Sequence, residues 1–342
     1  MSRAILRATA LAACALSVAC QGPQSMLGTN NPGGQSVEGL WWIALASTGF
    51  LSTVVILALG YAVVRARRAG RSGPDHPAPD VDGIQRESSV ILIAGALGPA
   101  LFLIGFLTLS VDTGQEISRP PSPPTLTVEV VGHMFWWEIR YPEAGVVTAN
   151  ELHIPAGETV AVQVTSADVI HSFWIPQLSP GKIDMVPGRT NLTWMLADEP
   201  GTYRGQCTEF CGTQHALMSM RVVASPPEDF ERWLDRRTQA PEVPSDLELR
   251  RGLSLFSQYG CDACHRIRDV TLLDLIGTAG PDLTDVGARS TLGALAVENT
   301  PETLGRWILN PHVYKPGVRM PPTDLSEEDL AALVAYLRSL DP

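Results

Sequence analysis

Two long stretches without a charged residue constrain this chain most. Residues 40–64 and 90–109 are apolar runs of twenty-five and twenty residues. Because a helix rises about 1.5 Å per residue, roughly twenty residues cross the hydrocarbon core of a bilayer. The sequence therefore predicts a two-helix transmembrane hairpin. Five arginines lie between the two runs and predict that this connection is cytoplasmic: Arg65, Arg67, Arg68, Arg71 and Arg86.

The first twenty residues have the layout of a bacterial export signal. Arg3 and Arg7 precede the apolar run 8–19, and small residues lead to Cys20. The sequence before Cys20 also resembles a lipoprotein cleavage box, so we expect residues 1–20 to be an export signal and Cys20 to be a candidate for lipidation. An exported N-terminus and a cytoplasmic connection place the residues after 110 on the outer, periplasmic face of the bacterial cytoplasmic (inner) membrane.

The charge balance excludes one class of partner. The chain carries 25 basic and 36 acidic residues, a formal net charge of −11. Nucleic-acid phosphates are bound by lysine and arginine, so this balance predicts no nucleic-acid partner. The acidic excess is largest in residues 226–342, with twelve basic and nineteen acidic residues. This segment would attract a basic partner at long range, although an ordinary solvated surface can have the same composition.

Residues 120–225 combine strand patterns with a cluster of soft metal ligands. Runs with strand character lie at 125–131, 159–165, 191–196 and 220–223, and turns that contain proline and glycine separate them. This pattern predicts an antiparallel β-sandwich. Cys207, Cys211, His215 and Met218 then supply two thiols, an imidazole and a thioether. Such ligands suit copper or zinc, so the residues alone leave the metal open. A catalytic Cys–His pair would leave the second cysteine and the methionine unexplained.

Three motifs in order resemble subunit II of the haem-copper cytochrome c oxidases. They are Asp-Val-Ile-His-Ser-Phe-Trp-Ile-Pro at 168–176, Lys-Ile-Asp-Met-Val-Pro-Gly-Arg at 182–189, and Cys-x-Glu-x-Cys-x-x-x-His-x-x-Met at 207–218. The resemblance covers residues 40–225 and implies a cupredoxin-like domain at 120–225 that holds a dinuclear copper centre, CuA. Zinc would close the site with four ligands and leave Met218 without a role.

The resemblance also implies the ligand set of CuA. Cys207 and Cys211 would bridge the two coppers, and His171 and His215 would each cap one copper. Met218 and the backbone carbonyl of Glu209 would be weak ligands. Thiolates shared between two coppers delocalise the exchanged electron, and a rigid scaffold limits reorganisation.

Residues around the implied centre resemble the family in two further respects. The Glu209 side chain would lie near a magnesium or manganese ion at the contact with subunit I, and Asp184 and Arg189 match positions near the same interface. Glu87, at the start of the second apolar run, resembles a glutamate that opens a proton channel of subunit I. The Trp-Thr and early Pro that follow it in the family are absent here.

The stretch Gly-His-Met-Phe-Trp-Trp at 132–137 resembles the aromatic segment through which electrons reach CuA. The family has tryptophan at the first aromatic position, where this chain has Phe135. Trp136 and Trp137 are therefore alternatives for the role. An aromatic cluster of this kind can equally be core or interface packing.

A second domain follows a linker. We expect a linker at 226–245, with a short amphipathic helix pattern at 230–237, and an all-α domain at 246–342. Cys261-Asp-Ala-Cys264-His265 is the attachment signature of a c-type haem, in which the thiols reach the vinyl groups and the imidazole binds the iron. A zinc site would need a second ligand pair, and no later cysteine exists. The Met-Pro-Pro loop before the last helix resembles a small class I cytochrome c, so Met320 is the predicted sixth ligand rather than His312.

Together these features predict the electron-input subunit of an aerobic respiratory terminal oxidase. Electrons would pass from a donor, cytochrome c or another basic carrier, through haem c to CuA. Haem-copper subunit I would then reduce oxygen and translocate protons, and subunit III is a further expected partner. Two alternatives use the same residues: a CuA-type nitric oxide reductase, and a stand-alone membrane-anchored electron carrier or copper-delivery protein.

Overall fold

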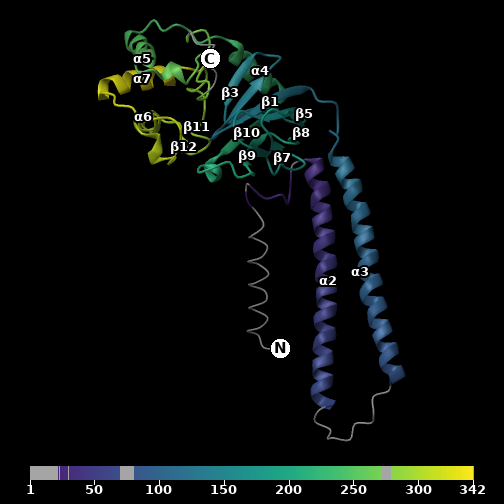
Figure 1. Cartoon of the computed structure of the whole chain (residues 1–342). Helices are drawn as coiled ribbons and strands as arrows, with labels where there is room; N and C mark the ends of the chain where they lie inside the picture. Colours follow the sequence, from purple (N-terminus) through teal and green to yellow (C-terminus); the bar gives the residue numbers. More distant parts are fainter. Residues whose placement is uncertain (1–21, 23, 30, 70–80, 272–278, 342) are drawn as a thin grey trace, which may run out of the picture. The chain divides into compact units, whose positions relative to one another are not determined.

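The structure is a computed structural model that describes residues 22–341 except 23, 30, 70–80 and 272–278 (Figure 1). The export signal predicted at 1–20, with its candidate lipidation site Cys20, lies outside the described residues. The chain divides into two compact units. One contains residues 35–119, and the other contains the residues before and after this range.

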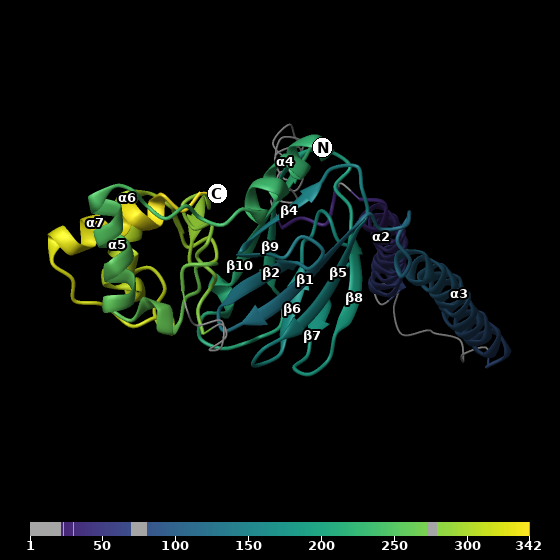
Figure 2. The same cartoon turned by 90° about the horizontal axis from the view of Figure 1, so that it is seen from above.

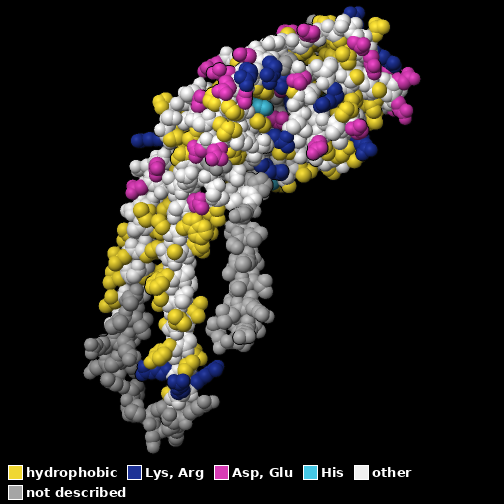
Figure 3. Space-filling model, turned by 180° about the vertical axis from the view of Figure 1, so that it is seen from behind, with side chains coloured by type: hydrophobic (Ala, Val, Ile, Leu, Met, Phe, Trp, Pro, Cys, Tyr) yellow, Lys and Arg dark blue, Asp and Glu magenta, His cyan; other side chains and the backbone are white. Residues whose placement is uncertain are grey.

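Two long helices form the unit of residues 35–119. Helix α2 (Pro32–Ala69) and helix α3 (Val81–Ile117) contain the two predicted apolar runs, and each includes a stretch long and apolar enough to cross a membrane. Figure 3 shows hydrophobic side chains along both helices and basic side chains at one end. Leu57 is 67% and Leu101 is 67% exposed, for example. Helices that expose apolar side chains in this way are stable in lipid. Two apolar N-terminal helices are therefore confirmed.

Residues 126–225 form a β-sandwich of two five-stranded sheets (Figures 1 and 2). The first sheet has the strand order β3-β2-β1-β5-β8, and the second has the order β4-β10-β9-β6-β7. The bounds are β1 Leu126–His133, β2 Trp136–Tyr141, β3 Val146–Ala149, β4 Glu151–Pro155, β5 Val160–Ser166, β6 His171–Trp174, β7 Ile183–Met185, β8 Asn191–Met195, β9 Gly201–Cys207 and β10 Ser219–Ser225.

Two of the strand pairs differ from the prediction. β1 pairs with β5 in parallel, and β10 pairs with β4 in parallel, whereas the other strands of both sheets pair antiparallel. The chain passes from the first sheet to the second between β3 and β4, and this crossover brings β5 back beside β1. The β-sandwich is confirmed, but a purely antiparallel one is wrong. Strand patterns fix which face is buried and do not fix the partner strand.

Alternating residues of both sheets fill the space between them. In β5, the side chains of Val160, Val162 and Val164 are fully buried, as a period of two requires. Helix α4 (Pro227–Thr238) adds Phe230 and Trp233 to the same core. Each large apolar side chain stabilises the fold by about 1.5–3 kcal/mol when buried. Much of the range expected as a linker is thus a helix that packs on the sandwich.

Residues 246–341 form a smaller helical domain with its own core. Its elements are α5 Leu247–Gln258, the 3-10 helices η2 Cys261–Ala263 and η3 Pro311–Val313, the short strands β11 Thr291–Leu292 and β12 Val297–Glu298, α6 Pro301–Leu309 and α7 Glu327–Arg338. Helix α5 crosses α7 at Gly252, where a Cβ atom would lie 2.2 Å from the carbonyl oxygen of Ala332. Only glycine permits this close crossing. The predicted helical cytochrome c fold is confirmed, with one small strand pair added.

Candidate metal centre

Strand pairing brings the candidate ligands together. His171 begins β6 and Cys207 ends β9, and these strands are neighbours in the second sheet, with Phe173 opposite Cys207. The loop after β9 carries the remaining candidates and contains the 3-10 helix η1 (His215–Leu217). His171 lies thirty-six residues before Cys207 in the sequence. The pairing of β6 with β9 places it beside the loop that carries the other ligands.

The side chains form one compact cluster. Cys207 Sγ lies 3.8 Å from Cys211 Sγ and 3.9 Å from His171 Nδ1. Cys211 Sγ lies 3.7 Å from His215 Nδ1 and 3.8 Å from Met218 Sδ. The carbonyl oxygen of Glu209 lies 3.1 Å from Cys207 Sγ. The structure thus brings together all six residues that the sequence singled out.

These distances fit metal coordination. Sulfur and nitrogen ligands lie about 2.0–2.3 Å from a bound metal, so neighbouring ligands of one metal are roughly 3.5 Å apart. The ligand atoms of His171, Cys207 and Cys211 all lie within 4.8 Å of one another. His215 stands on the other side of Cys211, so each thiol has its own imidazole. Thiolate and thioether are soft donors, and imidazole suits the same metals, so this set fits copper.

Asp168 orients the imidazole of His171. Its Oδ1 lies 2.9 Å from His171 Nε2, and its Oδ2 accepts a hydrogen bond from the amide of Met134 at 2.7 Å. A carboxylate accepts, so Nε2 carries the proton and Nδ1 presents its lone pair toward Cys207. Burial alone would raise the pKa of Asp168, but the hydrogen bonds from His171 and the two backbone amides outweigh it and lower the pKa.

The hydrogen bond between the two thiols shifts their pKa values in opposite directions. Hydrogen bonding from the Cys211 thiol lowers the pKa of Cys207 to about 3, against the opposing effect of burial. The same bond and burial raise the pKa of Cys211. Burial opposes protonation of His171, but its hydrogen bonds to Cys207 and Asp168 raise its pKa. The lowered pKa favours the thiolate form of Cys207, which is the form that binds metal.

Close packing fixes the His171 ring. Gly132 on β1 faces this ring, and a Cβ atom at Gly132 would lie 2.8 Å from His171 Cδ2. Trp137 packs at a tilt against it, with ring centroids 6.2 Å apart. The ring can therefore move little without disturbing β1 or β2.

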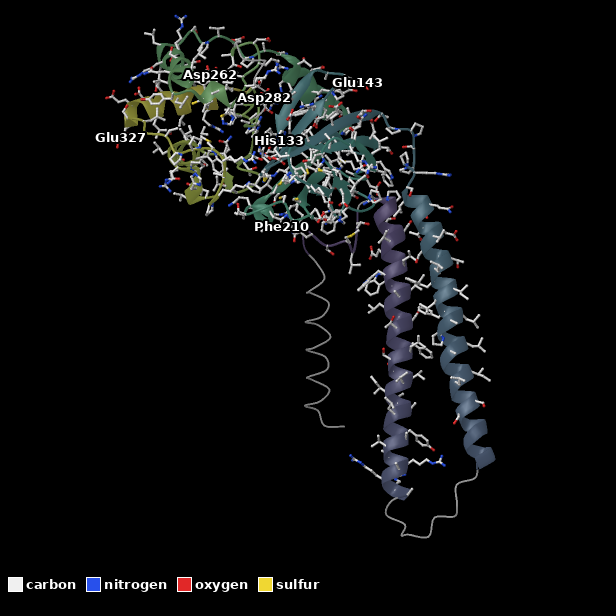
Figure 4. The ribbon with its side chains drawn as sticks, viewed as in Figure 1. His133, Glu143, Phe210, Asp262, Asp282 and Glu327 are labelled. Carbon is white, nitrogen blue, oxygen red and sulfur yellow. The ribbon has the colours of Figure 1, made fainter. Side chains whose placement is uncertain are left out.

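The three candidate electron-transfer aromatics occupy different positions. The Phe135 ring lies against Gly212, where a Cβ atom would be 3.2 Å from the ring, and Gly212 follows a candidate ligand directly. Trp137 is fully buried beside His171. Trp136 stacks on His133, which is labelled in Figure 4, with centroids 4.2 Å apart. Phe135 and Trp137 therefore touch the cluster, and Trp136 packs on a neighbouring histidine.

The Glu209 carboxylate belongs to a small charged group. Lys182 Nζ lies 3.5 Å from Glu209 Oε2 and 3.0 Å from Asp184 Oδ1, so one ammonium faces two carboxylates. All three side chains are about half exposed. Arg189 is exposed, and its carbonyl accepts a hydrogen bond from Thr165. Two of the residues expected at an interface thus lie together beside the cluster, and each remains accessible.

The second domain presents its own candidate ligands. Cys261 and Cys264 are free thiols; Cys261 begins η2 and Cys264 follows its last residue. His265 Nδ1 lies 2.8 Å from the carbonyl oxygen of Pro281 and donates to it, which leaves Nε2 for a metal. Gly280 permits this placement, because a Cβ atom there would lie 2.6 Å from the ring. Burial lowers the pKa of His265, which favours the neutral form that binds iron. These residues fit a covalently attached haem.

Met320 lies in the loop between η3 and α7 and is half-buried. Glu87 lies in the first turns of α3, and the structure describes only its backbone. Sequence reasoning gave no role to Asp168, although its position three residues before His171 in the same motif was a usable signal. Sequence reasoning also gave no role to Lys315, although lysine occurs only twice in the full sequence.

Comparison with known proteins identifies the class. The family model for the cytochrome c oxidase subunit II periplasmic domain matches residues 145–225, and the model for cytochrome c matches residues 249–341. Cytochrome c oxidase subunit 2 of Alkalihalophilus pseudofirmus is 35% identical over 298 residues, 85% of this chain and 83% of the relative. The Bacillus subtilis protein of the same name is 29% identical over 297 residues, 82% and 81% of the two chains.

One similar solved structure is the periplasmic domain of subunit II of cytochrome oxidase from Bradyrhizobium japonicum. It is 32% identical, covers 34% of this chain and 95% of that chain, and has a TM-score of 0.33. The sequence matches define a periplasmic subunit II domain joined to a cytochrome c domain. The chain belongs to the cytochrome c oxidase subunit 2 family. It is accordingly a membrane-anchored component of a haem-copper oxidase, with an implied copper site in one domain and an implied haem in the other.

Proposed function

We propose that this chain is the electron-input subunit of an aerobic respiratory terminal oxidase. Electrons would enter at haem c in residues 246–342, pass to a dinuclear CuA centre in residues 120–225, and leave for haem-copper subunit I. Oxygen reduction and proton translocation would take place in that partner. The observation that carries the proposal is the paired cluster, in which each of two adjacent thiols has its own imidazole nitrogen at 3.7–3.9 Å.

The chain's residues hold the copper pair in one geometry. Cys207 and Cys211 would bridge the coppers, His171 and His215 would cap them, and Met218 with the Glu209 carbonyl would bind weakly. When bound, the centre supplies one-electron exchange with little reorganisation. Asp168, Gly132 and the sheet register fix the imidazole on one side, so the protein itself resists rearrangement. Zinc would close the site with the two thiolates and the two imidazoles and leave the Met218 thioether without a role.

Four residues of the second domain would hold the haem. Cys261 and Cys264 would form the thioether links, His265 would bind the iron through Nε2, and Met320 would be the sixth ligand. A haem with these axial ligands supplies one-electron transfer at a raised reduction potential. The acidic charge of this domain supports a basic donor, such as a cytochrome c.

An apolar and charged surface beside the copper loop supports docking to subunit I. Phe210, labelled in Figure 4, is 78% exposed, and Ile170 and Leu217 are 46% and 42% exposed. Exposed apolar side chains of this size mark an interaction surface. The neighbouring carboxylates of Glu209 and Asp184 face a lysine, and oxygen ligands of this kind suit Mg²⁺ or Mn²⁺. We assign this group to the subunit I contact, with subunit III as a further partner.

The membrane orientation follows from the basic residues of α2. Arg67 and Arg68 lie in its last turn, so the connection to α3 would face the cytoplasm. The copper and haem domains would then lie on the periplasmic side, where a donor can reach them. Glu87, near the start of α3, would lie toward the cytoplasm, where protons for subunit I are taken up.

Purification of the complex from membranes tests this function. We expect two copper ions of CuA for each haem c, a paramagnetic spectrum of a mixed-valence copper pair, and oxygen consumption by the complex. Met218→Leu should alter the copper spectrum, whereas Met220→Leu changes a buried side chain that packs against Gly205 and should leave it unchanged. Nitric oxide consumption without oxygen consumption, or a chain that purifies without a haem-copper partner, would refute the proposal.

A further inference from the structure

A buried lysine joins the two domains of the larger unit. Lys315 is 1% exposed, and its Nζ donates to the carbonyl of Phe135 on the sandwich at 2.7 Å and to the carbonyl of Gly293 on the haem domain at 3.0 Å. No described carboxylate pairs with it. Burial of the ammonium lowers the pKa of Lys315 to about 7, against the opposing effect of the nearby Cys211 sulfur, which raises it. The contact is therefore not an ordinary surface pair.

The loop that carries Lys315 makes further contacts with the copper domain. A Cβ atom at Gly317 would lie 3.2 Å from the Thr213 hydroxyl, and Gly317 has a positive φ of 86°. One guanidinium nitrogen of Arg319 lies 3.9 Å from Asp168 Oδ2, and another lies 3.8 Å from the sulfur of Met134. The next residue is the candidate haem ligand of this loop. Residues 315–319, which we term the docking loop, thus touch the segments that flank the copper cluster.

Packed groups continue on both sides of Lys315. On the sandwich side, the Phe135 ring lies against Gly212, next to Cys211. On the haem side, a Cβ atom at Gly293 would lie 2.3 Å from the Trp307 ring, and Trp307 stacks on Tyr314 with centroids 6.4 Å apart. Tyr314 precedes Lys315 directly. A continuous set of contacts therefore runs from helix α6 through Lys315 and Phe135 to a candidate copper ligand.

A second anchor lies elsewhere in the same interface. The Glu151 carboxylate on β4 accepts hydrogen bonds from the backbone amides and the hydroxyl groups of Ser290 and Thr291 on the haem domain, at 2.6–3.2 Å. The Thr148 hydroxyl also donates to Asp285 at 2.7 Å. The interface therefore has several polar contacts, and among them Lys315 is the buried one beside the copper cluster.

We propose that Lys315 is the positioning residue for electron transfer between the haem domain and the copper centre. It holds the docking loop on Phe135, so that the electron crosses between the domains at this contact. The proposal rests on the proposed function. The step is a one-electron exchange in which the ferrous haem iron becomes ferric and the oxidised copper pair gains that electron. Lys315 acts through its hydrogen bond to the Phe135 carbonyl.

Loss of this hold has a specific kinetic consequence. The haem domain would remain attached through the chain after α4, so its effective concentration near the copper domain would stay high. Transfer would then wait for the domain to return to the docked position. A step limited by domain motion depends on solvent viscosity, whereas transfer within a docked pair does not. Viscosity dependence therefore separates positioning from a purely structural role.

The experiment uses the complete oxidase complex. Electrons are injected into haem c by a photoreductant, and absorbance changes of haem c and copper report the transfer rate at several glycerol concentrations. For Lys315→Met we expect the rate to fall about tenfold, the order that follows from loss of the hydrogen bond to the Phe135 carbonyl across the interface, and to become viscosity-dependent. The spectra and potentials of both centres should not change. The matched control Arg306→Met removes an exposed charge on α6 and should retain the wild-type rate.

Three outcomes decide the matter. A Lys315→Met complex with the wild-type rate and no viscosity dependence would overturn the proposal. If that variant does not fold, Lys315→Gln, whose shorter side chain cannot span the carbonyls of Phe135 and Gly293, must shift the viscosity dependence in the same direction, and a wild-type response there would also overturn the proposal. Absence of haem-to-copper transfer in the wild-type complex would instead refute the proposed function, independently of Lys315.

Discussion

Replacement of Asp168 by asparagine tests whether the copper cluster depends on a residue that binds no metal. Oδ1 lies 2.9 Å from His171 Nε2 and 2.7 Å from the amide nitrogen of Val169, and Oδ2 lies 2.7 Å from the amide nitrogen of Met134. Every partner is an N–H donor. Asparagine offers one oxygen and one NH₂ group, so in either orientation at least one donor faces another donor.

The magnitude follows from these contacts. If the asparagine oxygen faces His171, the bond from Met134 is lost, and a hydrogen bond to a charged group contributes about 1.5–3 kcal/mol. If the NH₂ group faces His171, the imidazole turns or changes its tautomer. Outer-shell partners of metal-binding histidines typically change metal affinity by about 10- to 100-fold, or about 1.4–2.7 kcal/mol. We expect a loss of copper affinity in this range.

A chelator competition measures the effect. Copper is withdrawn by a chelator of known affinity while the absorption of the copper centre and of haem c is followed. Asp198→Asn is the matched control, because Asp198 is an exposed acid on the loop after β8. A copper affinity of Asp168→Asn within about twofold of wild type would refute the assignment of Asp168 as the residue that orients His171.

Three further predictions follow from single contacts. Gly132→Ala places a methyl group 2.8 Å from His171 Cδ2, so the copper spectrum should change while haem absorption does not; an unchanged copper spectrum would contradict the packing argument. Met320→His should lower the haem reduction potential in a redox titration, because methionine ligation raises it, and an equal potential would exclude Met320 as ligand. Burial lowers the pKa of His153 to about 4. As the pH falls below about 6.5, His153 is therefore protonated in the unfolded chain but not in the folded protein, which favours unfolding. Wild type should therefore lose about 2 kcal/mol of unfolding free energy between pH 7 and pH 5, and denaturant titrations should find this loss absent in His153→Gln.

The parts of the structure that depend on local sequence could be predicted. The two apolar runs lie within α2 and α3, and the amphipathic pattern at 230–237 lies within α4. Four of the candidate copper ligands fall within twelve residues, so the motif itself identified them. Family resemblance supplied His171, and the pairing of β6 with β9 gives the physical reason.

The parts that depend on contacts between distant residues could not be predicted. Alternation shows that β1 and β5 each bury one face, but it does not show that they pair in parallel. Phe230 and Trp233 predict an amphipathic helix without naming the surface that covers them. Lys315 lies 180 residues from its partner Phe135, and a lone lysine in a loop gives no sign of burial.

The separation of His171 from the other ligands couples copper binding to folding. Cys207, Cys211, His215 and Met218 stay close in an unfolded chain, whereas His171 arrives only when β6 pairs with β9. Copper held by the unfolded chain would lack this imidazole, so the folded state binds more tightly. Mass action then converts the difference in affinity into resistance to unfolding. Because β6 must pair with β9 before His171 can bind, bound copper would stabilise the folded sandwich in addition to transferring electrons.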